Sequence, residues 1–179
     1  EVIQKGLRMI GQGMHGFVGN NGVKFTNLDH ELANPTDLRV FAIAQALEEG
    51  YTIERIVELT KIDAWFIGKL KNIVDYKQKL SAYNSLSEVP AEVLRQAKIY
   101  GFSDFQIARF VMKPQGNMER EMLEIRARRK ELNILPAVKR INTVASEHPE
   151  LTNYLYMTYA VEGHDVNYYK HEKPVAVLG

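Results

Sequence analysis

The chain has 179 residues, 45% of them hydrophobic and 25% charged, and its 23 Lys and Arg residues against 22 Asp and Glu residues leave a formal charge of +1 at pH 7. This near balance argues against a protein that mainly binds nucleic-acid backbones, because such proteins carry a clear basic excess. The absence of cysteine excludes disulfides, thiolate catalysis and cysteine-bound zinc, and no apolar run approaches the roughly 20 residues that span a bilayer.

Residues 2–10 are predicted to form a helix, because their apolar residues recur on one face. A loop follows in which residues 11–16 satisfy the dinucleotide-binding pattern G-x-G-x-x-G. That motif works when a strand delivers the glycines and a helix N-terminus receives the pyrophosphate. Here a helix precedes the glycines and residues 17–22 break helices, so we predict a flexible loop that binds no cofactor.

Capping signals predict several short helices between residues 34 and 131. Asn34-Pro35-Thr36-Asp37 is typical of a helix start, with Asn at the N-cap and Pro at the first helical position. That helix should end at Gly50. Ser103 and Gln106 have the spacing of a capping box before an apolar run. The further residues expected at helix starts are Thr52, Asp63, Pro90 and Asn117.

One short internal repeat is visible at an offset of 51 positions, where Gly50-Tyr51-Thr52 corresponds to Gly101-Phe102-Ser103. Each copy has a helix, a glycine stop, an aromatic residue, a hydroxyl cap and a second short helix. The aromatic residue stands where a Schellman motif would return to the preceding helix. We therefore expect two related helical lobes, neither of which buries much surface alone.

The character of the sequence changes near its C-terminal end. β-Branched and aromatic residues dominate Val138–Glu147 and Tyr154–Tyr159, and His148-Pro149-Glu150 between them cannot continue a strand, which predicts a β-hairpin. The second strand has large residues on both faces, so we expect it to be buried on both sides. Its rings, like those of Trp65-Phe66, could line a ligand pocket; rings that this chain leaves uncovered would cover a partner.

Both ends have the pattern of the interior of a longer polypeptide. Residues 1–5 resemble the middle of a helix rather than a frayed terminus. Residues 174–179 resemble a short buried strand that runs into a glycine turn, and the residues just before them supply no sheet for it. We therefore expect a fragment.

No residue pattern predicts catalysis or a metal centre, so the expected catalytic, cofactor-binding and metal-binding residues are none. All five histidines lie in predicted loops, without the i, i+4 spacing of a helical zinc site. His164-Asp165 has the composition of a ligand and its orienting carboxylate, but no further ligands surround it. Nucleophile-elbow and Walker patterns are absent.

Two features leave a nucleic-acid-binding alternative open. Residues 126–130 form a basic run, which is typical of a solvated helix C-terminus but could also bind phosphate. Residues 90–111 are predicted to be a helix, a glycine turn and a second helix, as in a helix-turn-helix module. The second helix offers only Gln106 and Arg109 to read bases, and its two apolar faces favour packing in a core.

Several segments resemble the middle region of carbamoyl-phosphate synthase large chains. In the family's order, they are Leu59-Thr60-Lys61-Ile62-Asp63-Ala64-Trp65-Phe66, Arg95-Gln96-Ala97-Lys98, Gly101-Phe102-Ser103-Asp104, Val138-Lys139-Arg140-Ile141-Asn142-Thr143, Thr152–Tyr159 and His164-Asp165-Val166. The resemblance covers essentially the whole chain and looks closest to eukaryotic, especially fungal, forms, including those fused to aspartate transcarbamoylase. The chain departs from the family at Asn142, usually Asp, at Ser146, usually Ala, and around residues 113–118, so an ion pair at position 142 is in doubt.

The resemblance implies a cytoplasmic parent enzyme that makes carbamoyl phosphate from bicarbonate, glutamine-derived ammonia and two ATP with Mg, for pyrimidine or arginine synthesis. It also implies that this segment has no active site of its own. Instead, the segment would connect two ATP-grasp synthetase halves and mediate self-association. Its implied partners are those adjacent domains and further copies of the chain, with no nucleic acid and no membrane.

We therefore expect a mainly α fold with two small helical lobes and a short C-terminal β-hairpin. The expected divisions are an N-terminal helix and glycine-rich linker from the preceding ATP-grasp half (1–33), a helical oligomerization region (34–136, with related units near 35–80 and 88–131), an extended connector (137–173) and the first strand of the following half (174–179). Apolar positions expected to be exposed on the short repeat helices are candidate subunit contacts, namely Ile53, Ile56, Phe105 and Phe110.

Overall fold

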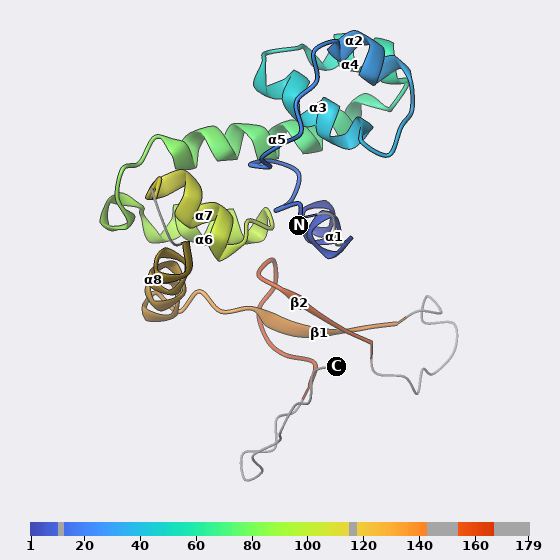
Figure 1. The fold of residues 1–179 in the computed structure, drawn as a ribbon. Coiled ribbons are helices and arrows are strands. Elements are labelled where there is room, and N and C mark those ends of the chain that lie inside the picture. Colours follow the sequence, from blue (N-terminus) through green and yellow to red (C-terminus); the bar gives the residue numbers. More distant parts are fainter. Residues whose placement is uncertain (11–12, 115–117, 143–153, 167–179) are drawn as a thin grey trace. The chain divides into compact units, whose positions relative to one another are not determined.

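The computed structural model describes residues 1–10, 13–114, 118–142 and 154–166. The chain divides into two compact units, Glu1–Ile134 and Leu135–Gly179. Helices build the first unit, and a two-stranded antiparallel sheet lies in the second (Figure 1). The expected mainly α fold class is confirmed. The expected strand at residues 174–179 lies outside the described residues.

The first unit consists of short helices that pack around one long helix. Its elements are α1 (Val2–Met9), α2 (Leu28–Ala33), α3 (Arg39–Glu48), α4 (Ile53–Thr60), α5 (Ala64–Ser81), the 3-10 turn η1 (Leu86–Glu88), α6 (Ala91–Ile99), α7 (Asp104–Val111) and α8 (Met118–Glu131). In this unit, α5 is the long helix that runs from the α2–α4 group to the α6–α8 group (Figure 1). It contacts α3, α4 and α7, so both groups share it as a packing partner.

Apolar residues at helical spacing explain how α5 serves both groups. Ile67, Leu70, Ile73 and Val74 are all buried, and they recur every three or four residues as one stripe of a helix requires. Burial of such a side chain stabilises the fold by roughly 1.5–3 kcal/mol. The expected cap of this helix is also confirmed, because the Asp63 side chain accepts a hydrogen bond from the Trp65 amide at 2.8 Å.

The two copies of the internal repeat have the same local geometry. Gly50 and Gly101 both adopt the left-handed conformation, with φ of 89° and 86°. The amide of Tyr51 donates to the carbonyl of Ala46, and the amide of Phe102 donates to the carbonyl of Ala97, at 2.9 and 3.0 Å. These are the six-to-one bonds of a Schellman motif, as the repeat predicts.

The hydroxyl cap of each copy is also confirmed. Thr52 accepts a hydrogen bond from the amide of Arg55, and Ser103 accepts one from the amide of Gln106. The side-chain oxygen of Gln106 in turn accepts a hydrogen bond from the Ser103 amide, which completes the expected capping box.

The expected helix start at Asn34-Pro35 is wrong. Asn34 instead ends α2, a helix within the expected linker, and its side chain donates to the carbonyl of His30 at 2.8 Å. Because the residue before a proline is disfavoured in the helical region, Pro35 terminates α2 rather than opening α3. α3 begins at Arg39, with no side-chain cap on Leu38.

The second unit contains the expected pair of antiparallel strands. Strands β1 (Ala137–Ile141) and β2 (Tyr154–Thr158) are antiparallel, with Ala137 opposite Thr158 and Ile141 opposite Tyr154. The rest of the expected first strand, residues 143–147, lies outside the described residues. Leu155 and Met157 project to one face of the pair and Tyr154 to the other, and all three are exposed. The expectation that β2 is buried on both sides is therefore wrong.

Candidate functional site

Residues 16–18 of the glycine-rich segment after α1 are buried in the core, where a flexible loop was expected. Gln4 of α1 is fully buried, and its side-chain oxygen accepts hydrogen bonds from the amide of Phe17 at 2.8 Å and the side chain of Gln106 at 3.3 Å. A Cβ atom at Gly16 would lie 2.3 Å from this oxygen. Gly16 therefore permits a close approach between backbone and side chain, which explains the glycine without a cofactor.

Further along the same segment, Gly19 approaches α7 equally closely. A Cβ at Gly19 would lie 2.5 Å from the ring of Phe110, and Arg109 donates from one guanidinium nitrogen to the carbonyl of Gly19 at 2.7 Å and from the other to the side chain of Asn21. Phe17 and Val18 between these glycines are almost completely buried. Residues 16–18 thus belong to the core between α1 and α7, and Gly19 packs on α7.

This arrangement removes the basis of the helix-turn-helix alternative. Gln106 is fully buried, where it donates to the carbonyl of Val18 at 3.0 Å, and Arg109 binds the glycine-rich segment. The two side chains that would read bases are therefore committed inside the fold. Ile107, Ala108 and Val111 of the same helix are also buried, so α7 contributes mainly to the core of the helical unit.

A buried ion-pair cluster joins the ends of α6, α7 and α8. Lys98 is 7% exposed and donates to the carboxylate of Asp104 and to the carbonyl of Phe102, both at 2.8 Å. Arg129 reaches the same carboxylate at 3.0 Å. The basic run on α8 is therefore not wholly solvated, because one of its arginines belongs to this cluster. Lys98 and Asp104 also lie within two of the segments that carry the family resemblance.

The protonation of this cluster follows from its surroundings. Burial lowers the pKa of Lys98 from its ordinary value, against the opposing effect of Asp104. Burial acts to raise the pKa of Asp104, but Lys98 and Arg129 together outweigh it and leave that pKa below its ordinary value. The carboxylate is therefore ionised at neutral pH. Its oxygens bind Lys98 and Arg129, so the cluster has a structural role.

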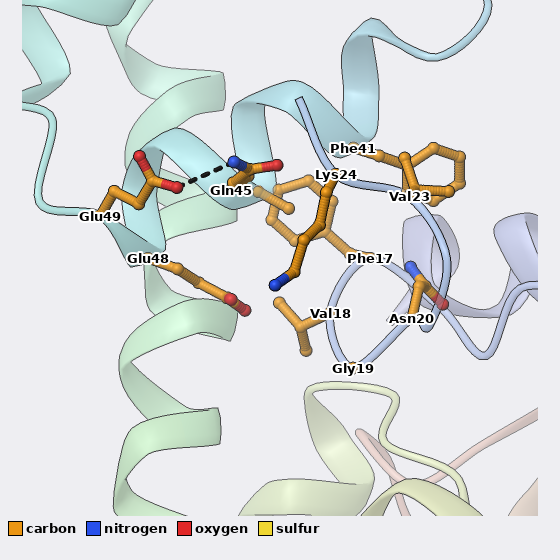
Figure 2. Close-up of a pocket in the computed structure, with 11 residues that line it drawn as sticks. Phe17, Val18, Gly19, Asn20, Val23, Lys24, Phe41, Gln45, Glu48 and Glu49 are labelled. Atoms are coloured by element: carbon orange, nitrogen blue, oxygen red, sulfur yellow. Dashed lines mark hydrogen bonds between the residues drawn. The ribbon is translucent and has the colours of Figure 1, made fainter. Parts of the chain in front are cut away.

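A pocket of about 400 Å³ opens between the glycine-rich segment and α3 (Figure 2). Phe17, Val18 and Phe41 contribute apolar lining, and the side chains of Lys24 and Glu48 reach into the opening. The lining has titratable groups in Lys24, Glu48 and Glu49, but no hydroxyl, thiol or histidine side chain. Among the described residues, no group of three His, Asp or Glu side chains could hold a metal ion.

The structure describes three of the five histidines, His15, His30 and His164. His15 stacks on Phe105 with a ring separation of 4.1 Å, and His30 lies in α2 rather than in a loop. In the second unit, His164 accepts a hydrogen bond from the amide of Val138, while Asp165 accepts one from the amide of Arg140 and pairs with Lys139. The pair therefore anchors a loop on β1. His148 and His171 lie outside the described residues.

The candidate subunit contacts differ in their accessibility. Ile56 and Phe110 are 0% and 6% exposed, so the expectation that they are exposed is wrong; both fill the core because they lie on the inner faces of α4 and α7. Ile53 and Phe105 are half-buried. A contact role for any of the four stays a prediction.

The largest aromatic feature on the surface of the first unit is the pair Trp65 and Phe66 at the start of α5. Their side chains are 61% and 55% exposed, and their rings meet edge to face at 5.0 Å. The ammonium group of Lys69 lies 5.2 Å above the indole ring. An exposed aromatic pair flanked by a cation is typical of a protein-binding surface rather than of a core.

Comparison with known proteins gives one consistent result. Residues 1–133 match the family model described as the carbamoyl-phosphate synthetase large chain, oligomerisation domain. Multifunctional protein URA2 of Saccharomyces cerevisiae is 45% identical over 180 residues, covering 100% of this chain and 8% of the relative. Multifunctional protein CAD of Squalus acanthias is 47% identical over 95% of this chain and 7% of the relative.

A third relative has a different description. The mitochondrial arginine-specific carbamoyl phosphate synthase large chain of Neurospora crassa is 44% identical over 100% of this chain and 14% of the relative. The chain thus spans only a small part of each of these proteins. None of the helices within residues 1–10, 13–114 and 118–142 has both the length and the apolar composition needed to cross a bilayer.

Proposed function

The chain belongs to the family of carbamoyl-phosphate synthetase large-chain oligomerisation domains, and we propose that it acts as a non-catalytic connector and self-association domain within a carbamoyl-phosphate synthase. The single observation that carries this proposal is a coincidence of boundaries. The family model matches residues 1–133, and the helical unit comprises Glu1–Ile134. The matched region is therefore one compact body, as a connector requires.

The parent enzyme would be an ATP-dependent ligase that forms carbamoyl phosphate from bicarbonate, glutamine-derived ammonia and two ATP with Mg. Its two synthetase halves would carry all of this chemistry. Two observations support the absence of a catalytic role for this segment: Gly16 of the nucleotide-like pattern packs on Gln4 and Gln106, and the described part of the chain offers no metal cluster.

The names of the relatives are consistent with two kinds of parent enzyme. Some are named multifunctional proteins, and others are named arginine-specific large chains, one of them mitochondrial. We place this chain in a cytoplasmic pyrimidine or arginine synthase. The adjacent synthetase domains of the same polypeptide and further copies of the chain would be its partners.

Self-association would use a larger surface centred on the exposed aromatic pair Trp65 and Phe66. Aromatic residues dominate the energetic centres of interfaces, because each buries a large area at a small cost in side-chain entropy. Both rings lie on the surface of the helical unit, so a second copy could bury them without unfolding. Ile53, half-buried at the start of the neighbouring α4, would extend the contact.

Sedimentation velocity of the chain over a range of concentrations tests this proposal. We expect a reversible oligomer, and we expect Trp65→Ala with Phe66→Ala to raise its dissociation constant at least ~10-fold, as loss of interface aromatics does. Leu123→Ala is the matched control, because Leu123 is similarly exposed but lies on α8. A chain that stays monomeric at every concentration, or hydrolyses ATP unaided, would contradict the proposal.

A further inference from the structure

We propose that α1 is a two-sided docking helix, whose polar face is fixed on the helical unit and whose apolar face packs against another domain of the same polypeptide. This inference rests on the proposed function, because the partner is one of the domains that the connector would join. The distribution of residues on α1 is the reverse of the usual one. A surface helix normally turns its apolar stripe to the core and its polar residues to water.

The inner face of α1 is polar and firmly held. Gln4 is fully buried between the amide of Phe17 and the side chain of Gln106. Arg8 donates to the carbonyl of Gly101 at 2.9 Å and to the side chain of Gln106 at 3.2 Å. Buried polar groups are costly unless they are hydrogen-bonded, so these bonds fix which face of α1 points inward.

The outer face of α1 is apolar and uncovered. Val2 and Met9 are 69% and 83% exposed, and Ile3 and Ile10 are also exposed. At 3.6 residues per turn these four side chains form one continuous face. Scattered exposed apolar residues are ordinary, but a contiguous apolar face on a soluble unit marks a surface that something else covers.

A glycine in the middle of this face supports a close approach by the partner. Gly6 stands four residues after Val2 and four before Ile10, and a Cβ added there would meet nothing within 4 Å. Glycine in a helix interior is destabilising relative to alanine, and the helical unit itself gives no packing reason for it. A surface that fits directly against the backbone at Gly6 supplies that reason.

The size of the face favours a tethered domain over a second copy. Four side chains expose on the order of a few hundred Å², whereas a stable complex of separate proteins buries about 800 Å² on each partner. A domain on the same polypeptide needs less area, because tethering keeps it at an effective concentration in the millimolar range. The relatives carry ample additional polypeptide, since this chain spans 7–14% of their length.

Hydroxyl-radical oxidation of Met9, followed by mass spectrometry, tests the inference in two samples: this chain alone, and the whole polypeptide of which it would be a part. Oxidation of methionine follows its exposure, so we expect rapid oxidation in the chain alone and at least ~10-fold slower oxidation in the whole polypeptide. Gly6→Ala should restore much of the oxidation in the whole polypeptide, because the added methyl group holds the partner away.

Gly6→Ala should weaken docking in the whole polypeptide, but it should increase the thermal stability of the chain alone. There, Gly6→Ala should raise the thermal midpoint by about 2–4 °C, because alanine favours the helix and meets no obstacle. Gly68→Ala in α5 is the matched control for this gain, since Gly68 also has open space above it. Loss of stability in the Gly6 variant alone would overturn the claim that its outer side is open.

Three results would overturn the inference. Met9 could be oxidised equally in both samples, the Gly6 variant could keep full protection in the whole polypeptide, or Met9 of the chain alone could become protected as concentration rises, which would identify a second copy. Self-association is measured separately, by sedimentation. A monomeric chain with a protected Met9 in the whole polypeptide would count against self-association alone, and an oligomeric chain with a reactive Met9 would count against the docking helix alone.

Discussion

The helical unit and the hairpin differ in how far they bury their apolar side chains. In Glu1–Ile134, helices share the core around α5, and the buried charges of Lys98 and Asp104 are paired. In the described part of Leu135–Gly179, two strands pair while Leu155 and Met157 stay exposed. A two-stranded hairpin is at best marginally stable alone in water. We infer that the helical unit is self-supporting and that the hairpin depends on a covering partner.

The largest difference between the two units should come from their carboxylates. Asp104→Ala leaves Lys98 buried without its anion, and breaking a buried pair costs about 3–5 kcal/mol. Asp165→Ala, in the loop anchored on β1, removes an exposed pair with Lys139, so the helical unit should unfold as before. Urea unfolding followed by far-UV circular dichroism measures both. Equal losses of unfolding free energy in the two variants would contradict this difference between the units.

Low pH should destabilise the helical unit through the same carboxylate, that of Asp104. The pKa of folded Asp104 lies below its ordinary value because Lys98 and Arg129 outweigh the effect of burial, so its contribution to stability is complete above the ordinary value of about 3.9 and is lost as pH falls through the lowered pKa of the folded state. The stability difference between the native chain and Asp104→Asn should therefore shrink below pH 4. A constant difference between pH 7 and pH 2.5 would contradict this assignment.

Truncation of a leucine side chain should give the next largest difference in stability between the two units. Leu94 is fully buried in α6, and Leu94→Ala should cost about 2–4 kcal/mol through lost burial and a residual cavity. Leu155→Ala on the exposed face of β2 removes the same atoms, yet it should cost under ~0.5 kcal/mol, as is usual at a surface. Unfolding curves of the two variants provide the measurement. A large loss at Leu155 would show that the hairpin has a core of its own.

Capping should have the smallest effect within the helical unit. Ser103→Ala removes the acceptor for the Gln106 amide and should cost about 1 kcal/mol. Thr52→Ala at the corresponding position of the repeat should cost a similar amount, since it caps α4 in the same way. Thermal melts of both variants check this equivalence, and a difference of several-fold would show that the repeat is only a likeness of sequence.

Local features of the helical unit could be predicted from the sequence because their causes are local. The caps at Thr52, Asp63 and Ser103 and the glycine stops at Gly50 and Gly101 each depend on residues within about six positions. Asn34-Pro35 shows the limit of this method, because the same dipeptide can end one helix or begin the next. Which of the two occurs depends on whether α2 forms, and the short apolar pattern of α2 did not predict a helix.

The candidate site could be predicted only in part, because it depends on contacts between distant residues. Gln4 and Gln106 are 102 positions apart, so the packed role of the glycine-rich segment could not be read from its spacing. Burial of Ile56 and Phe110 depends on which helix face meets α5. The spacing of Val2, Gly6 and Ile10 defines one face of α1 in the sequence, but only the structure shows that this face points outward.

Amide hydrogen exchange of the whole 179-residue chain, read residue by residue, tests the contrast between the two units most directly. We expect the amides of Ile107–Val111 in α7 to exchange only through global unfolding, and those of β1 and β2 to exchange orders of magnitude faster through local opening. Equal protection of the hairpin and α7 would contradict the claim that the helical unit is stable alone while the hairpin needs a covering partner.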